Sequence, residues 1–364
     1  MIDPRNSYVA VIKVVGVGGG GINAVSRMVQ DGVQGVEFIS INTDAQSLIL
    51  AEADNKLIIG ETGLGAGSDP EVGRQAALES RDAIAEVLKG ADMVFITAGK
   101  GGGTGTGAAP IVADIAKELG ILTVGVVTRP FTFEGLRRSL QADKGISELR
   151  ENVDCLIVIP NDKLLEVSNE DTSLIDSFRM ADTVLKDGIQ GITDLIIMPG
   201  LINLDFADVK SIISNAGTAL FGSGEASGEN RSIEAAKNSI SSPLLEYSIE
   251  GASGILLNIT GGPDLKLFEV NQAAEIIRNS TKRDADIIFG AVLDENRKDS
   301  LKVTVIATGF DEELIASRVA PKEEVSFEEK VLEETEEAGE EIEEEEETKE
   351  DYLDIPSFLR KKNQ

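Results

Sequence analysis

Two glycine-rich segments constrain the fold of this 364-residue chain more than any other feature. Residues 16–21 read GVGGGG and residues 99–107 read GKGGGTGTG. Each segment follows a short run of β-branched residues and precedes a helical pattern. Such a turn between a strand and a helix is typical of parallel α/β domains that bind phosphate. Glycine lets an anion approach the backbone, and the helix N-terminus supplies N–H donors.

Short β-branched runs and helical patterns alternate along the first 170 residues, which predicts a parallel sheet with helices on both faces. The expected strands are 9–15, 37–42, 93–97, 122–127 and 156–160, and the clearest helices between them are 22–30, 71–88 and 108–119.

A longer helical pattern follows, from about Ser173 to Ile197. Ser173 and Asp176 resemble a capping box at its start, and Pro199-Gly200 ends it. At 1.5 Å per residue this helix spans about 36 Å, long enough to join two domains. Beyond it we expect helices over 207–214, 231–240 and 267–280, with strands over 254–260, 287–293 and 301–308.

The predicted fold class is therefore α/β: a Rossmann-like parallel-sheet domain, a long central helix, a smaller C-terminal α/β domain and a disordered acidic tail. The expected boundaries are 1–172 for the nucleotide-binding domain, 173–198 for the helix, 199–316 for the second domain, 317–350 for an acidic linker and 351–364 for a terminal peptide.

Composition excludes several kinds of chemistry. The chain has no His and one Cys, Cys155, so His-dependent catalysis, a Cys-rich zinc site and a disulfide framework are ruled out. The net charge is −30, which disfavours binding to nucleic acid or anionic lipid. The start of the chain lacks the apolar segment of a signal peptide, and no apolar run is long enough to span a membrane. We therefore expect a cytoplasmic protein, with Cys155 as a buried core thiol.

The acidic charge is concentrated near the end. Residues 323–350 contain 16 Glu and 2 Lys and should be disordered, because they can bury little apolar surface. Residues 351–364 regain apolar side chains, among them Tyr352, Phe358 and Leu359, and end in basic ones. We interpret this peptide as a tethered ligand for another protein; the alternative is a frayed terminus.

The two glycine segments do not fit one standard nucleotide template. Residues 16–21 with Asp44 match the fingerprint of an NAD- or FAD-binding Rossmann unit, which leaves residues 99–107 unexplained. The P-loop pattern GxxxxGK[ST] is absent. Two glycine loops at neighbouring strand ends suggest that a triphosphate is held along its length. A third segment, 63–70, could close over its terminal phosphate.

Residues 101–107, GGGTGTG, are similar to the signature of the tubulin/FtsZ GTPase superfamily. The wider pattern resembles its bacterial cell-division branch over about 10–310 and again in the tail. The supporting segments are 42–45 (NTDA), 130–135 (PFTFEG), 159–162 (IPND) and 203–209 (NLDFADV).

The resemblance implies GTP and GDP as ligands and Mg²⁺ across the phosphates, with no dedicated protein metal site. It also implies roles for residues at matching positions. Those expected to contact phosphates or ribose are Gly19, Gly20, Gly21, Asn23, Asp44, Ala66, Gly67, Ser68, Gly103, Thr104, Gly105, Thr106, Glu134 and Arg138.

Phe178 and Asp182 would hold guanine in this family, Phe178 by stacking and Asp182 by hydrogen bonding. A carboxylate only accepts hydrogen bonds, so it matches the two adjacent donors of guanine and repels the bare N1 of adenine. Taken from the residues alone, Asp182 is better interpreted as a solvated helix residue.

In the family, the loop after the long helix inserts over the nucleotide of the next subunit. The resemblance thus makes Asn203, Asp205 and Asp208 catalytic residues that orient or polarise the attacking water, and we expect Asp208 to matter more. The alternative for Asp205 is an N-cap of the following helix.

Function follows from the same resemblance: an assembly-dependent GTPase that forms head-to-tail filaments of a mid-cell division ring. Residues 351–364 would bind membrane-anchoring division proteins, without strong direct binding to lipid. The alternatives are an NAD/FAD oxidoreductase and a GTP-binding scaffold with little turnover.

Lys100 stands where the family more often has an apolar residue. We expect it to be a solvated surface lysine, with contact to a phosphate or a neighbouring subunit as the alternative.

Overall fold

The computed structural model describes residues 10–168, 172–198, 200–202, 204–294 and 297–310. All of them belong to one compact unit. The expected linker 317–350, the peptide 351–364 and Asn203 lie outside the described residues. The boundary between the two predicted domains within this unit stays a prediction. None of the described helices is long and apolar enough to cross a membrane.

In the described part of the chain, ten strands form one continuous sheet in the order β3-β2-β1-β4-β5-β6-β7-β10-β8-β9. The first seven strands pair in parallel, β10 pairs antiparallel with β7 and β8, and β8 and β9 are parallel. The strands are β1 (Ile12–Val17), β2 (Glu37–Asn42), β3 (Asn55–Ile58), β4 (Met93–Gly99), β5 (Leu122–Arg129), β6 (Cys155–Pro160), β7 (Gly217–Ser227), β8 (Gly254–Gly261), β9 (Asp286–Leu293) and β10 (Ser300–Thr308). All eight predicted strands are present.

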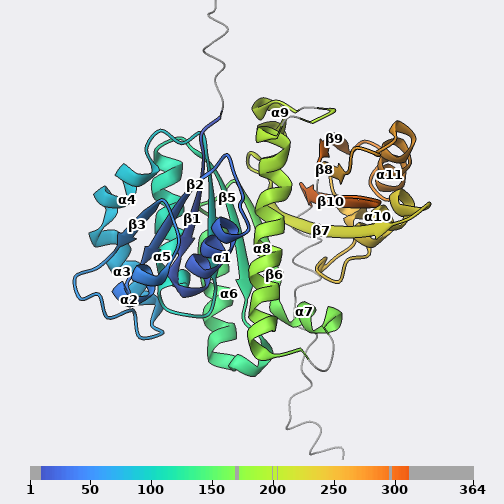
Figure 1. Ribbon diagram of the computed structural model, residues 1–364. Coiled ribbons are helices and arrows are strands. Elements are labelled where there is room, and N and C mark those ends of the chain that lie inside the picture. The colour runs from blue at the N-terminus through green and yellow to red at the C-terminus, as the bar shows by residue number, and fades with distance from the viewer. Residues whose placement is uncertain (1–9, 169–171, 199, 203, 295–296, 311–364) are drawn as a thin grey trace, which may run out of the picture. The chain divides into compact units, whose positions relative to one another are not determined.

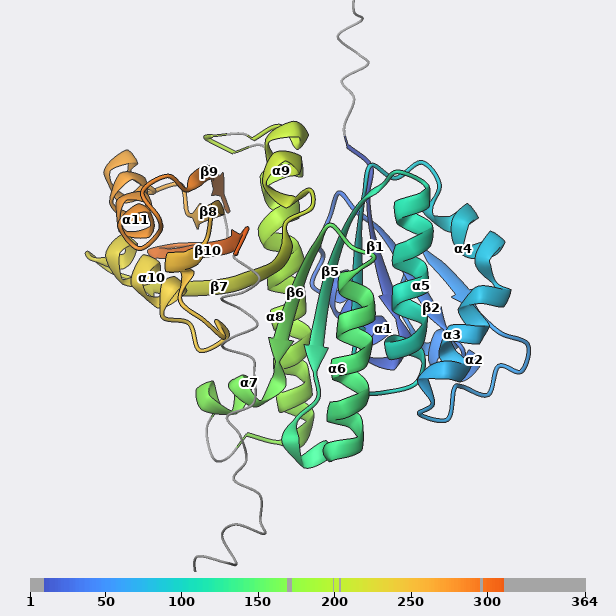
Figure 2. The ribbon, with the colours of Figure 1, turned by 180° about the vertical axis from the view of Figure 1, so that it is seen from behind.

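Helices cover both faces of the parallel sheet. Figure 1 shows α1 and α8 on one face, and Figure 2, the view from behind, shows α5 and α6 on the other. The helices are α1 (Gly18–Gln30), α2 (Ala45–Leu50), α3 (Pro70–Glu79), α4 (Arg81–Leu88), α5 (Thr104–Glu118), α6 (Leu136–Arg150), α7 (Asn161–Val167), α8 (Leu174–Ile197), α9 (Phe206–Ile213), α10 (Arg231–Ile240) and α11 (Leu267–Asn279).

The single helix expected over 71–88 was wrong: it is two helices, α3 and α4, separated at Ser80. The Ser80 hydroxyl accepts a hydrogen bond from Gly60 N at 3.2 Å, and its backbone leaves the helical region. A serine side chain that bonds to backbone in this way competes with the helix. Apolar periodicity continues across the break, so the pattern did not reveal it.

Strand β7 was not predicted, although it joins the two halves of the sheet. It pairs with β6 over Gly217–Ala219 and with β10 along most of its length. Its glycines lower the apolar signal, but they are needed for packing against α10. A Cβ on Gly222 would lie 2.2 Å from the carbonyl oxygen of Ser239, and one on Gly224 would lie 2.3 Å from that of Ala235.

Helix α8 is the expected long central helix, with 24 residues. Its N-cap Ser173 accepts a hydrogen bond from Asp176 N at 3.1 Å. The helix contacts both halves of the fold: Lys186 pairs with Asp31 after α1 at 2.7 Å, and Asp187 pairs with Lys302 of β10 at 3.0 Å.

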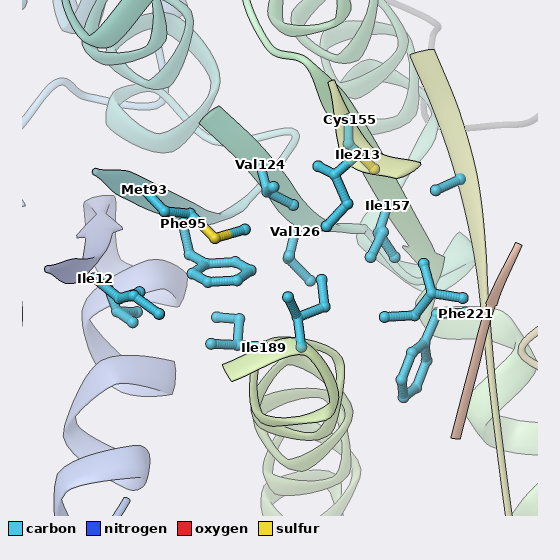
Figure 3. Packing of buried hydrophobic residues seen from close by; sticks show 14 of the residues in the cluster. Ile12, Met93, Phe95, Val124, Val126, Cys155, Ile157, Ile189, Ile213 and Phe221 are labelled. Atoms are coloured by element: carbon cyan, nitrogen blue, oxygen red, sulfur yellow. The ribbon is translucent and has the colours of Figure 1, made fainter. Parts of the chain in front are cut away.

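The core between α8 and the sheet is apolar. In Figure 3, Ile189 of α8 points toward Phe95 and Val126 on the strands. Cys155 lies in this cluster with no exposed surface, and burial raises the pKa of its thiol to about 12. The expected buried core thiol is therefore confirmed.

Candidate nucleotide site

The two glycine loops lie side by side because β1 and β4 are parallel neighbours. A Cβ on Gly18 would lie 2.6 Å from Gly105 N, and one on Gly20 would lie 3.2 Å from Gly99 Cα. Gly18 also has a φ of +72°, which glycine adopts without strain. These contacts are between backbones, so the glycines let the two loops meet as well as leave room for a ligand.

Both loops present helix N-termini without a side-chain cap. Helix α1 starts after Val17 and α5 starts after Gly103, and neither N-cap residue makes a side-chain hydrogen bond to its helix. The first-turn N–H groups of a helix have no intrahelical partner and attract anions. Gly19, Gly20 and Asn23 are exposed, whereas Gly21 is buried.

The threonines of the second loop fix its shape. The Thr104 hydroxyl lies 2.7 Å from the Thr43 hydroxyl, and Gly101 N donates to Thr106 Oγ1 at 2.9 Å. Thr104 and Thr106 are both buried, and so are Gly103 and Gly105.

The third loop rests on the start of α5. A Cβ on Gly103 would lie 2.7 Å from Ala66 Cβ, and the Ala66 carbonyl accepts from Asp69 N at 2.9 Å. Gly67 and Ser68 are exposed and both have positive φ values, 57° and 61°. All three glycine segments therefore converge at the carboxyl ends of β1 and β4, as the sequence suggested.

Asp44 is the N-cap of α2. It accepts hydrogen bonds from Gln46 N at 2.9 Å and from the Ser47 hydroxyl at 2.5 Å, and the Ser47 bond lowers the pKa of its carboxyl. It also pairs with Leu64 in an isolated antiparallel bridge. Asp44 therefore helps to position the third loop.

A second group of predicted residues surrounds Phe131. Glu134 pairs with Arg138 and accepts a hydrogen bond from Phe131 N at 3.1 Å. The Phe131 ring meets Phe178 edge-on, with ring centroids 5.6 Å apart. Phe178 remains 42% exposed, so part of its side chain is accessible to a ligand. The residues assigned to ribose and to guanine are thus brought together.

Asp182 lies one turn beyond Phe178 on α8. Burial raises the pKa of its carboxyl to about 6, and the charge of Arg27 on α1 opposes that shift. No hydrogen bond from another described residue contributes to this shift. A desolvated carboxylate of this kind gains free energy when a ligand donates to it. The interpretation of Asp182 as a solvated helix residue therefore does not hold.

Two residues at this edge were missed or misplaced by the sequence analysis. Asn161 begins α7 directly after β6; it is 5% exposed, and its Oδ1 has no hydrogen-bond partner among the described residues. The sequence did offer a signal for Asn161, because this residue belongs to the IPND segment that supports the family resemblance. The expectation that Lys100 is a solvated surface lysine was wrong. Its side chain is 4% exposed, and its Nζ donates to Gly105 O.

The expected catalytic acids lie beyond the other end of α8 (Figure 1). Asp205 is the N-cap of α9 and accepts from Asp208 N at 2.8 Å, while Asp205 N donates to Asp208 Oδ2 at 3.3 Å. Both carboxylates thus form a capping box, and each keeps one oxygen free of it. Both residues are exposed. Asn203 is outside the described residues, and its catalytic role stays a prediction.

Within the described ranges, no group of three or more His, Cys, Asp or Glu side chains is placed to hold a metal ion. The backbone N–H groups at the two helix N-termini favour a ligand with several phosphates. A cation at this site would be coordinated mainly by the phosphate oxygens of that ligand.

Parallel strands whose glycine loops meet at helix N-termini, with a long helix that leads to the second half of the same sheet, define a tubulin-like GTPase. The family model of the Tubulin/FtsZ family GTPase domain matches residues 11–169, and that of the FtsZ family C-terminal domain matches residues 217–311. An empty FtsZ dimer from M. jannaschii is 44% identical, with a TM-score of 0.81, covering 84% of this chain and 90% of that one.

The chain belongs to the FtsZ family. Members of this family bind GTP and GDP, hydrolyse GTP and belong to the filament-forming cytoskeleton. GDP-bound CetZ1 from Haloferax volcanii is 20% identical, with a TM-score of 0.72, covering 85% of this chain and 99% of that one; it shares the fold. This assignment replaces the oxidoreductase alternative, which left the second glycine loop unexplained.

Proposed function

We propose that this protein is a GTPase whose active site is completed between subunits of a head-to-tail filament. The observation that carries the proposal is the separation of Asp182 from Asp205 and Asp208. Asp182 lies in the first half of α8, and the two acids follow its end. Because the helix rises about 23 Å between Asp182 and Ile197, these acids cannot serve the nucleotide of their own chain.

A second subunit stacked on the first would bring its Asp205 and Asp208 to that nucleotide. The carboxylate oxygens left over from the capping box would accept hydrogen bonds from the attacking water and orient it toward the γ-phosphate. Glycine loops and helix N-termini would stabilise the charge on the phosphates. Mg²⁺, held mainly by phosphate oxygens, would neutralise part of that charge.

Exposed apolar side chains at both ends of α8 support stacking. Near its start, Leu174 and Ile175 are exposed, as are Phe133 and Leu136 beside the nucleotide site; beyond its end, Leu201 is exposed. Exposed apolar clusters mark interaction surfaces. Two different surfaces that pair head to tail give an open filament rather than a closed dimer.

In the cell, we propose that the filament acts in the cytoplasm at the mid-cell division ring. Residues 351–364 would bind membrane-anchoring division proteins, with the acidic linker 317–350 as a spacer. The net charge of −30 argues against nucleic acid as a partner. With a net charge of about +1, the terminal peptide should bind lipid only weakly by itself.

The experiment that tests an intersubunit site is phosphate release from GTP over a wide range of protein concentration. We expect almost no activity below a threshold and a constant rate per added subunit above it, with assembly measured in parallel by light scattering. An unchanged specific activity at every dilution, without assembly, would mean that each chain holds a complete site. GTP binding with negligible turnover at all concentrations would favour the scaffold alternative.

Acidification should weaken guanine binding. Because the pKa of Asp182 is about 6, the free protein loses its carboxylate below pH 6, and GDP affinity should fall about tenfold per pH unit there. The effect on stability has the opposite sign. Between about pH 6 and 4 the folded state binds a proton that the unfolded state lacks, so the Asp182 contribution to the free energy of unfolding rises as pH falls.

The measurement is a pH series of GDP titrations, paired with thermal unfolding of the nucleotide-free protein. The phosphates of GDP also titrate near pH 6. The same pH series with the Asp182→Asn variant measures the contribution of the phosphates alone, because this variant binds the same GDP but has no carboxyl group at position 182. Equal pH slopes in the two proteins would contradict a role for Asp182.

A further inference from the structure

Lys100 is a buried cation inside the turn between β4 and α5. Its backbone N–H donates to the carbonyl oxygen of Thr128 at 2.9 Å, which anchors the residue at the carboxyl end of β5. Its ammonium donates to the carbonyl oxygen of Gly105 at 3.2 Å. With 4% of its surface exposed, the side chain lies beneath the second glycine loop and does not reach toward solvent.

This cation has no ion-pair partner among the described residues. Charged side chains on the neighbouring elements include Arg137, Arg138, Asp143, Lys144, Glu148 and Arg150 of α6, Asp69 and Arg74 at α3, and Arg129 of β5. Of these, Glu148 affects Lys100 and raises its pKa, but burial outweighs that effect and lowers the pKa to about 7. A buried ammonium without a counter-ion is costly, and an anion bound at the loop would reduce that cost.

The hydrogen bond to Gly105 connects Lys100 to the expected phosphate donors. The first helical bond of α5 runs from Gly107 N to Gly103 O, so the preceding N–H of Thr106 has no intrahelical partner. That N–H belongs to the same peptide group as the Gly105 carbonyl. An ammonium on the carbonyl oxygen polarises the peptide and makes its N–H a stronger donor to an anion.

We propose that Lys100 is the buried counter-charge of the nucleotide phosphates: it acts through the Gly105–Thr106 peptide, without touching the nucleotide, and takes up a proton when GTP or GDP binds. This positioning role rests on the phosphate site proposed above. It depends on the charge of the side chain, since an apolar residue at position 100 could hold the loop but could carry no charge.

The test is isothermal titration of the nucleotide-free full-length protein with GDP at pH 8, in buffers of different ionisation enthalpy. At this pH the amine of Lys100 is largely neutral in the free protein, and the phosphates have already lost their protons. We expect wild type to take up more than half a proton per GDP bound. The phosphates do not contribute to this uptake, because they are already deprotonated at pH 8 and the N–H donors of the loops stabilise that form.

Two substitutions separate charge from packing. Lys100→Met should abolish proton uptake and weaken GDP binding about threefold at pH 8, where the wild-type amine is mostly neutral before GDP binds. At pH 6, where that amine is already charged, the loss should be roughly 10- to 30-fold, the size expected for one charge pair about 8–10 Å apart at an effective dielectric constant near 20. Lys100→Arg stays charged, so it should keep most of the affinity and show no uptake. Lys89→Met, which removes an exposed cation just after α4, should match wild type in both readouts.

The Met variant should fold, because it replaces a buried charge by an apolar side chain of similar length. Its thermal unfolding midpoint without nucleotide should equal or exceed that of wild type. GDP binding by wild type without proton uptake, or equal uptake by Lys100→Met, would overturn the role of Lys100 and leave the GTPase assignment intact. Failure of wild type to bind GDP would overturn the nucleotide site itself, and the role of Lys100 with it.

Discussion

Replacing Asp208 by Asn is expected to lower the steady-state rate of GTP hydrolysis by about 10²–10³-fold, the usual loss when a group that orients or deprotonates the attacking water is removed. Binding of GTP should stay within about twofold of wild type, because Asp208 lies beyond the end of α8, far from Phe178 and Asp182. Turnover is measured above the assembly threshold and affinity by equilibrium titration.

The substitution is chosen to spare the capping box. An Asn side-chain oxygen can still accept from Asp205 N, so α9 should begin at the same residue. Asp205→Ser provides the matched test, because serine is a good N-cap without a carboxylate. If capping is the whole role of these acids, both variants will hydrolyse GTP like wild type, and the intersubunit mechanism will fail.

A mixture of two inactive variants tests which chain supplies the acids. Asp208→Asn keeps an intact nucleotide site, and Asp182→Ala keeps an intact catalytic loop. In a head-to-tail pair, the loop of the second can serve the nucleotide of the first. We expect the mixture to hydrolyse GTP well above the sum of the separate rates. No gain on mixing would indicate that the acids act within their own chain.

Asp182→Asn is expected to weaken GTP binding by about 10²-fold or more, because the amide places a donor against a donor of guanine and leaves both unpaired. The same change should improve binding of xanthosine triphosphate. Xanthine carries a 2-oxo acceptor in place of the 2-amino group of guanine, so it matches an amide that both accepts and donates.

The control is Asp176→Asn, the same substitution six residues earlier on the same helix. Asp176 is exposed and bonds to Ser173 and Arg179, at the start of α8. It should keep the preference for GTP over xanthosine triphosphate. If Asp182→Asn also keeps that preference, guanine is recognised by other groups, and Asn161 becomes the first candidate because its side-chain oxygen is buried without a described partner.

Much of the fold could be predicted because the relevant signals are local. Glycine is required wherever two backbones approach, as at Gly18 and Gly20, and it is visible in the sequence without any knowledge of the partner. Apolar runs of four to eight residues predicted the strands in the same way. The N-cap of α8 was also readable, since Ser173 bonds to a residue only three positions away.

The errors arose where a distant segment decides the outcome. Strand β7 is glycine-rich because α10 packs closely on it, and that weakened its apolar pattern. Lys100 was expected in solvent because lysine usually lies there. Its burial depends on β5, α5 and α6 surrounding the turn, which the residues next to it do not indicate.

The sequence by itself determined the alternation of strands and helices, the glycine segments that meet at β1 and β4, and the long helix α8, because each depends on neighbouring residues or on the steric freedom of glycine. Only the tertiary structure decided that Asp182 is desolvated, that Asp205 and Asp208 cap α9 together, and that Lys100 lies under the phosphate loop. Burial and charge at a residue depend on every segment packed around it, and chain order alone does not specify those segments.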